Sequence, residues 1–134
     1  MGSQLSILQL NSHRKNNNPL LGLSLSKLCD TMASFKSICE SFALDLSHFQ
    51  KIFNVNENHF VIWDTDNNGL IDALELFSGM AVFSSAKFED IIRFLFDLFD
   101  LNEVNSLCKI DVEFMMFSCM SSAYKIYNIN EENH

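Results

Sequence analysis

The sequence predicts an all-α protein in which two helix–loop–helix units, their loops joined by a very short β-bridge, follow additional N-terminal helices. Three observations support this fold class. Apolar residues recur at steps of three and four on both sides of an acidic loop that begins at Asp64. A second acidic position with similar flanks, Asp100, follows 36 residues later. Thirteen phenylalanines and six methionines supply the core of a single domain, which at 134 residues needs no disulfides.

The N-terminal segment, residues 1–24, is predicted to be flexible and to precede a helical domain of residues 25–134. Its stretch from Asn11 to Pro19 is polar, lacks periodicity and holds the only proline. Its start, M-G-S-Q-L-S, fits the acceptor pattern for N-myristoylation, in which removal of Met1 exposes Gly2, although so short a pattern also arises by chance. One myristoyl chain binds membranes only marginally, so the predicted membrane association is reversible.

Residues 25–55 are predicted to form one long amphipathic helix or two short ones, and then a further short helix that begins after Ser47 as its cap. The first part has apolar residues at helical spacing on one face. They are Leu25, Leu28, Met32, Phe35, Cys39 and Phe42. No acidic loop survives in this region, which is therefore interpreted as degenerate, at most a decayed copy of the unit that follows.

The first complete unit covers about residues 56–84. Its loop, from Asp64 to Glu75, reads D-T-D-N-N-G-L-I-D-A-L-E and matches the calcium-loop pattern at every constrained position. The same residue types also form ordinary acidic surface turns, which is the alternative interpretation. Apolar residues at helical spacing on both sides favour the metal site, and they are Phe60, Trp63, Leu74, Phe77 and Met80.

The predicted ligands of the calcium ion are all oxygens, as this hard cation requires. In chain order they are the side chains of Asp64, Asp66 and Asn68, the backbone carbonyl of Leu70, Asp72 through a bridging water, and both carboxylate oxygens of Glu75. Gly69 is expected at the turn, because glycine adopts positive φ without steric cost.

The second unit, about residues 88–124, repeats the apolar flanks of the first unit but not its ligands. Its loop, counted from Asp100, places Val104 at position five, where it offers no side-chain oxygen. Asp111 at position twelve is one methylene shorter than glutamate. We therefore interpret this loop as a structural partner with little metal affinity of its own.

Two further positions predict the shape of the second loop. Asn105 replaces the glycine of the first loop, which is tolerable because asparagine is among the few residues that adopt positive φ. Leu107 is expected to pair with Ile71 in the short β-bridge between the loops. A helix is expected to follow and to continue to Asn128.

On these motifs the chain resembles the calmodulin and calcineurin-B-like EF-hand superfamily over roughly Asn56 to Tyr124. Its N-terminal motif resembles that of the myristoylated neuronal-calcium-sensor and calcineurin-B branches. The resemblance implies a switch in which calcium draws Glu75 and the following helix inward and opens an apolar groove to an amphipathic helix or a regulated enzyme subunit. Relatives commonly carry four such hands in two lobes, whereas one pair is predicted here. The groove is expected to involve some of Phe77, Met80, Met115, Met116 and Met120. Any single one of these methionines is better explained as core, and only their clustering favours a groove.

Composition excludes several classes of function. The net charge of −8 argues against nucleic acid, whose phosphates require clustered Lys and Arg. The sequence contains no signal peptide and no apolar run near about eighteen residues, so the predicted location is the cytoplasm, peripheral at membranes only through Gly2. Four cysteines without metal-binding spacing are predicted to be reduced and buried, and they are Cys29, Cys39, Cys108 and Cys119.

Two functions remain for a chain with this loop. No Ser/His or Cys/His constellation and no phosphate loop can be identified, so the chain is predicted not to be an enzyme. The favoured function is that of a calcium-responsive regulatory or adaptor protein. The alternative is a structural component, cytoskeletal or ciliary, whose calcium site only stabilises a helix pair.

Overall fold

A computed structural model describes residues 18–132 of the chain, with side chains described to residue 128. The predicted acylation site at Gly2 lies outside these residues. The described part holds six helices and one antiparallel pair of two-residue strands. In chain order they are α2 (Leu25–Ile38), β1 (Ala43–Leu44), α3 (Leu46–Phe53), α4 (Glu57–Trp63), β2 (Ile71–Asp72), α5 (Ala73–Val82), α6 (Phe88–Phe99) and α7 (Lys109–Glu132).

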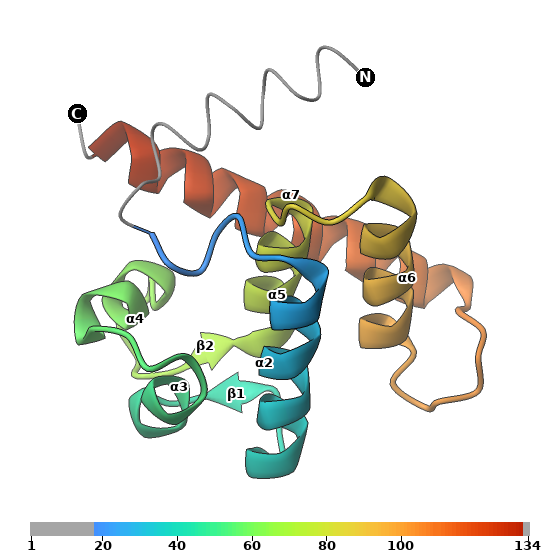
Figure 1. The fold of residues 1–134 in the computed structure, drawn as a ribbon, viewed down its shortest axis with the longest axis horizontal. Helices are drawn as coiled ribbons and strands as arrows, with labels where there is room; N and C mark the ends of the chain where they lie inside the picture. Colours follow the sequence, from blue (N-terminus) through green and yellow to red (C-terminus); the bar gives the residue numbers. More distant parts are fainter. Residues whose placement is uncertain (1–17, 133–134) are drawn as a thin grey trace.

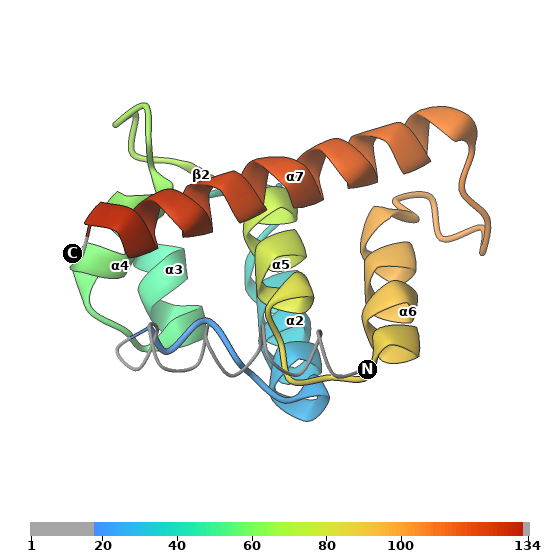
Figure 2. The same cartoon turned by 90° about the horizontal axis from the view of Figure 1, so that it is seen from above.

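Helix α7 runs along the whole domain and crosses the other helices (Figures 1 and 2). Helices α3 and α4 lie at one end of the domain and α6 at the other, with α2 and α5 between them. Helix α5 is the centre of the core, because nearly all of its residues are buried. Its Phe77 ring contacts the rings of Phe35 on α2 and Phe53 on α3, at centroid distances of 5.5 and 6.0 Å. Each of these elements thus buries an apolar face against α5.

The N-terminal helices confirm the predicted helical region and correct its boundaries. Helix α2 begins at Leu25, after Ser24 accepts a hydrogen bond from the Lys27 N–H, and it ends before Phe42. Helix α3 begins at Leu46 rather than after Ser47. The cap is Asp45, whose carboxylate accepts from the His48 N–H at 2.9 Å. Aspartate is as strong a cap as serine, and Asp45, two residues before Ser47, takes this role here.

The predicted β-bridge is present, but its predicted partner was wrong. Ile71 pairs with Leu44 and Asp72 pairs with Ala43, so the first loop joins the region before it and not the loop after it. Leu107, the expected partner, lies outside any strand and is half-buried. Leu44 and Ile71 are both buried in the core, which explains why this pairing is favoured.

The ordered domain begins earlier than predicted. Residues 1–24 were expected to be flexible, yet Leu20 is buried and the Gly22 N–H donates to the Phe83 carbonyl at 2.9 Å. Residues 20–22 therefore pack on the end of α5. Among the described residues, no helix is both long and apolar enough to span a membrane.

The prediction that the cysteines are buried was wrong. Cys29 and Cys108 are exposed, whereas Cys39 and Cys119 are half-buried, and all four are free. Apolar neighbours in the sequence misled here. Cys29 and Cys119 lie on amphipathic helices, which also carry such residues beside the buried face, whereas Cys39 and Cys108 lie just outside the ends of α2 and α7.

Candidate metal centre

Helix α4 delivers the chain to the acidic loop. Asn56 caps the helix by accepting from the Asn58 N–H at 2.9 Å, close to the predicted start. Phe60 and Trp63 are buried, as their spacing predicted, and Asp64 follows directly as the C-cap. Burial of this aromatic pair therefore fixes where the loop begins.

The first six residues of the loop wrap around the Asp64 carboxylate. Its Oδ1 accepts from the Asn68 N–H at 3.2 Å and its Oδ2 from the Gly69 N–H at 2.8 Å. Asn67 at φ 57° and Gly69 at φ 84° supply the two left-handed residues that this path needs. The turn predicted at Gly69 is confirmed.

Two side-chain oxygens later in the loop accept hydrogen bonds from nearby backbone N–H groups. Asn68 Oδ1 accepts from the Leu70 N–H at 2.9 Å, and Asp72 Oδ1 caps α5 by accepting from the N–H groups of Leu74 and Glu75. Loss of hydration around the Asp72 carboxyl raises its pKa, and the two backbone hydrogen bonds offset this rise in part.

An open depression of about 480 Å³ lies beside the loop. The polar residues that line it are Thr65, Asp66, Asn68, Asp72 and Lys125. It thus brings side chains from three of the predicted ligand positions beside one lysine of α7.

Glu75 is not among the residues that line this depression. Its Oε1 lies 2.6 Å from Lys125 Nζ, and its Oε2 accepts a hydrogen bond from Ser121 Oγ at 3.0 Å. Oε1 is buried and has no hydrogen-bond donor with good geometry in the part of the chain that the structure describes, which leaves the lysine charge as its partner. Within residues 18–132, no three His, Cys, Asp or Glu side chains are placed to hold a metal ion together.

The residues present fit calcium in chemistry and, from Asp64 to Asp72, in backbone conformation. Carboxylate, amide and carbonyl oxygens are the donors that calcium prefers. The buried Oε1 of Glu75 is a further oxygen without a hydrogen bond, and it would complete the set once Glu75 turned away from Lys125. The loop therefore offers oxygen donors of the kind that calcium prefers, while Glu75, the last of the predicted ligands, is directed toward α7.

The loop after α6 repeats the backbone of the first loop. Asp100 Oδ1 accepts from the Val104 N–H at 3.1 Å and Oδ2 from the Asn105 N–H at 2.8 Å, the same offsets as at Asp64. Glu103 and Asn105 have φ of 55° and 60°, and the residues at the same two positions of the first loop also have positive φ. The expected positive φ at Asn105 is confirmed.

The second loop nevertheless differs at its end. Asp111 Oδ2 accepts hydrogen bonds from the Cys108 thiol and N–H, at 3.1 and 3.0 Å, which lower the pKa of this carboxyl. The side chain is therefore directed at the start of α7. The low metal affinity expected of this loop stays a prediction.

Sequence motifs missed the two residues that hold Glu75. Ser121 and Lys125 lie on α7, far along the chain from the loop, and only their spacing of four on one helix is visible in the sequence. The predicted groove residues are also divided. Phe77 and Met80 are fully buried, Met115 is half-buried, and Met116 and Met120 are exposed on α7.

Comparison with known proteins adds no assignment. No protein-family model matches the chain, and no solved structure matches it. The described part is a small, mostly helical domain, and any function must be argued from its residues.

Proposed function

We propose that the chain is a calcium-binding EF-hand protein that acts as a calcium-responsive regulatory or adaptor protein. The observation that carries this proposal is the loop from Asp64 to Asp72. It combines a carboxylate that binds two backbone N–H groups, a glycine at positive φ, and a capping aspartate at the start of the next helix. An ordinary acidic turn can form without this combination of three features.

The unit before the loop supports the same proposal as its partner hand. Asp45 follows β1 and caps α3 just as Asp72 follows β2 and caps α5. Five residues separate α2 from Leu44, whereas seven separate α4 from Ile71, so the loop between α2 and β1 is too short to surround a cation. We therefore propose three hands in the described part, of which only the middle one binds calcium.

The proposed adaptor role rests on exposed apolar side chains of α7. Several of them recur at three- and four-residue steps on one face, and they are Phe117, Met120, Tyr124 and Tyr127. The proposed partner is a protein that presents an apolar helix. The predicted myristoylation of Gly2 would add reversible membrane binding, and it stays a prediction because this residue is not described.

Calorimetry with calcium tests the site. We expect one ion per chain with a dissociation constant of roughly 10⁻⁷ to 10⁻⁵ M. Glu75→Gln should weaken binding by about tenfold or more, because it removes the charged ligand that closes the site. Glu89→Gln, which removes the same charge from an exposed position on α6, is the matched control. Equal affinity in both variants would refute the site, and a second ion lost on Asp100→Ala would show that the second loop also binds.

Exposure of apolar surface separates the adaptor from the structural alternative. We expect the fluorescence of the dye ANS to rise when calcium is added to the wild type and to stay constant in Glu75→Gln. The physical reason is that calcium would move α5 and α7 apart and uncover core side chains such as Met80. If calorimetry confirms binding and the dye signal stays flat, the site only stabilises the helix pair.

A further inference from the structure

Lys125 connects the two ends of the candidate calcium loop. Its ammonium lies 2.6 Å from Glu75 Oε1, where the loop ends, and donates to the Trp63 carbonyl at 3.3 Å, just before the loop begins. The Trp63 carbonyl lies at the C-terminal end of α4, where the helix dipole favours a positive charge. A cation from the chain itself therefore binds at the closing point of the loop.

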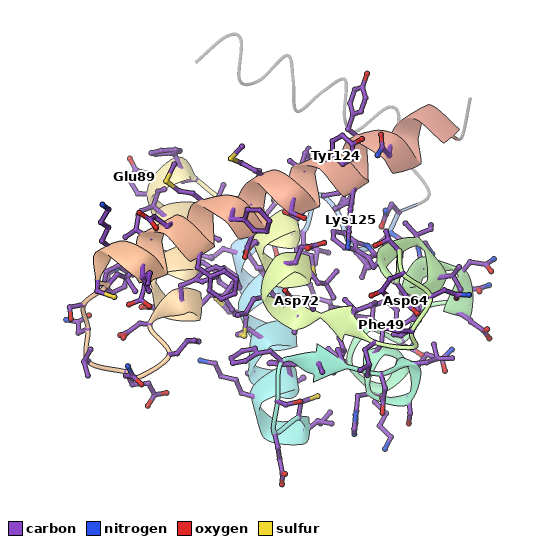
Figure 3. The ribbon with its side chains drawn as sticks, turned by 180° about the vertical axis from the view of Figure 1, so that it is seen from behind. Phe49, Asp64, Asp72, Glu89, Tyr124 and Lys125 are labelled. Carbon is purple, nitrogen blue, oxygen red and sulfur yellow. The ribbon has the colours of Figure 1, made fainter. Side chains whose placement is uncertain are left out.

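The crossing of α5 and α7 places this lysine. A Cβ on Gly79 would lie only 3.0 Å from Ser122 Cβ and 3.1 Å from Ile126 Cδ1, so the glycine lets α7 approach closely. Glu75 is one turn before Gly79 on α5, and Lys125 is next to Ile126 on α7. Lys125 accordingly points from α7 toward α4 and the loop, whereas Tyr124 points away from the domain (Figure 3).

The contact is more than a surface ion pair. The side chains of Lys125 and Glu75 are 22% and 13% exposed, so water screens them less than it screens a fully solvated pair. Ser121 Oγ binds the other carboxylate oxygen, so both oxygens of Glu75 are engaged with α7. Calcium would need the same two oxygens at the last position of its loop.

We infer that Glu75 is exchanged between Lys125 and a calcium ion, so that calcium binding and docking of the C-terminal half of α7 exclude each other. This inference rests on the proposed calcium site and adds the regulation of that site. When α7 is docked, Lys125 supplies the positive charge beside Glu75. When calcium takes Glu75, Lys125 and Ser121 lose their partner and the end of α7 is released.

Thermodynamic linkage turns this exchange into a measurable effect. If calcium loosens α7, then loosening α7 must raise the calcium affinity by the same factor. Lys125→Met keeps most of the apolar stem of the side chain but removes the charge, so it leaves Glu75 free for the ion. We expect the calcium dissociation constant to fall by about tenfold, within the usual range of coupling between sites.

The experiment compares the wild type with Lys125→Met, Ser121→Ala and Lys109→Met on the full chain. Lys109 is the matched control, since it is a lysine on the same helix, its side chain is 91% exposed, and it only approaches Glu113 at 3.9 Å. Calorimetry gives the calcium affinity. Hydrogen exchange of the amides from residue 121 to residue 128, with and without calcium, reports the release of α7.

Competition between Lys125 and calcium for Glu75 predicts tighter calcium binding in Lys125→Met, a smaller rise in calcium affinity in Ser121→Ala and no change in Lys109→Met. It also predicts that calcium speeds hydrogen exchange at residues 121–128 of the wild type. If Lys125 only repelled the calcium ion by its charge, the affinity would change in Lys125→Met but calcium would not speed this hydrogen exchange. If all variants bind calcium with equal affinity, or if calcium leaves the hydrogen-exchange rates of the wild type unchanged, the inference is overturned while the calcium site stands. Absence of calcium binding in every variant overturns the proposed function itself. If Lys125→Met fails to fold, the smaller change in Ser121→Ala and the wild-type exchange data decide.

Discussion

Phe77→Ala is expected to lower the free energy of unfolding by about 3–5 kcal/mol, the range for removal of a buried phenylalanine ring. Phe77 is fully buried on α5. Its ring contacts Phe35 and Phe53, so one substitution leaves a cavity where α2, α3 and α5 meet. Aromatic pairs of this kind add to the loss beyond the area that they bury.

Urea denaturation followed by circular dichroism measures this effect. Val82→Ala serves as the control, because Val82 lies on the same helix but is exposed, and its loss should change stability by no more than about 0.5 kcal/mol. A loss near 1 kcal/mol in Phe77→Ala would mean that the core collapses around the cavity, and that α5 does not organise the fold as described.

The parts of the fold that depend on local chemistry could be predicted from the sequence. Gly69 and Asn105 sit where the two loops need positive φ, because few other residue types adopt this conformation. The apolar spacing before Asp64 predicted the burial of Phe60 and Trp63. Each of these inferences uses residues within one or two helical turns of each other, so neighbours along the chain carry the information.

The parts that depend on contacts between distant segments could not be predicted in the same way. From its position in the loop Ile71 was expected to pair with Leu107, because the spacing of the two acidic loops made the following loop the natural partner. The structure pairs it with Leu44. The engagement of Glu75 by Lys125 depends on how α7 crosses α5, which no local motif encodes.

Local chemistry and contacts between distant segments together explain why Glu75 does not lie with the other predicted ligands of the candidate site. The loop from Asp64 to Asp72 is held by hydrogen bonds between its own residues and by the pairing of β2 with β1. Glu75 belongs to α5, so its direction is decided by the helix that packs on α5. The shape of the loop and the position of its last ligand are therefore controlled by different parts of the chain.

Gly79→Leu is expected to break the contact between α5 and the C-terminal half of α7. A Cβ at this position would lie 3.0 to 3.1 Å from Ser122, Ile126 and the ring of Trp63, so a leucine side chain has no free space. Overpacking of this kind costs about 1–3 kcal/mol when the site can adjust. Since two of the three nearest atoms belong to Ser122 and Ile126 of α7, we expect α7 to lift away from α5.

Hydrogen exchange and tryptophan fluorescence measure the result. Amides from residue 121 to residue 128 should exchange faster in Gly79→Leu, and the emission of Trp63, the only tryptophan, should shift to the red as water reaches its ring. Val82→Leu, which adds bulk to an exposed position of the same helix, should change neither signal. Since the crossing at Gly79 also holds Lys125 on Glu75, this variant should bind calcium more tightly, as Lys125→Met does. Faster exchange together with weaker calcium binding would instead mean that a docked α7 supports the loop, and that Lys125 stabilises the site rather than competing for it.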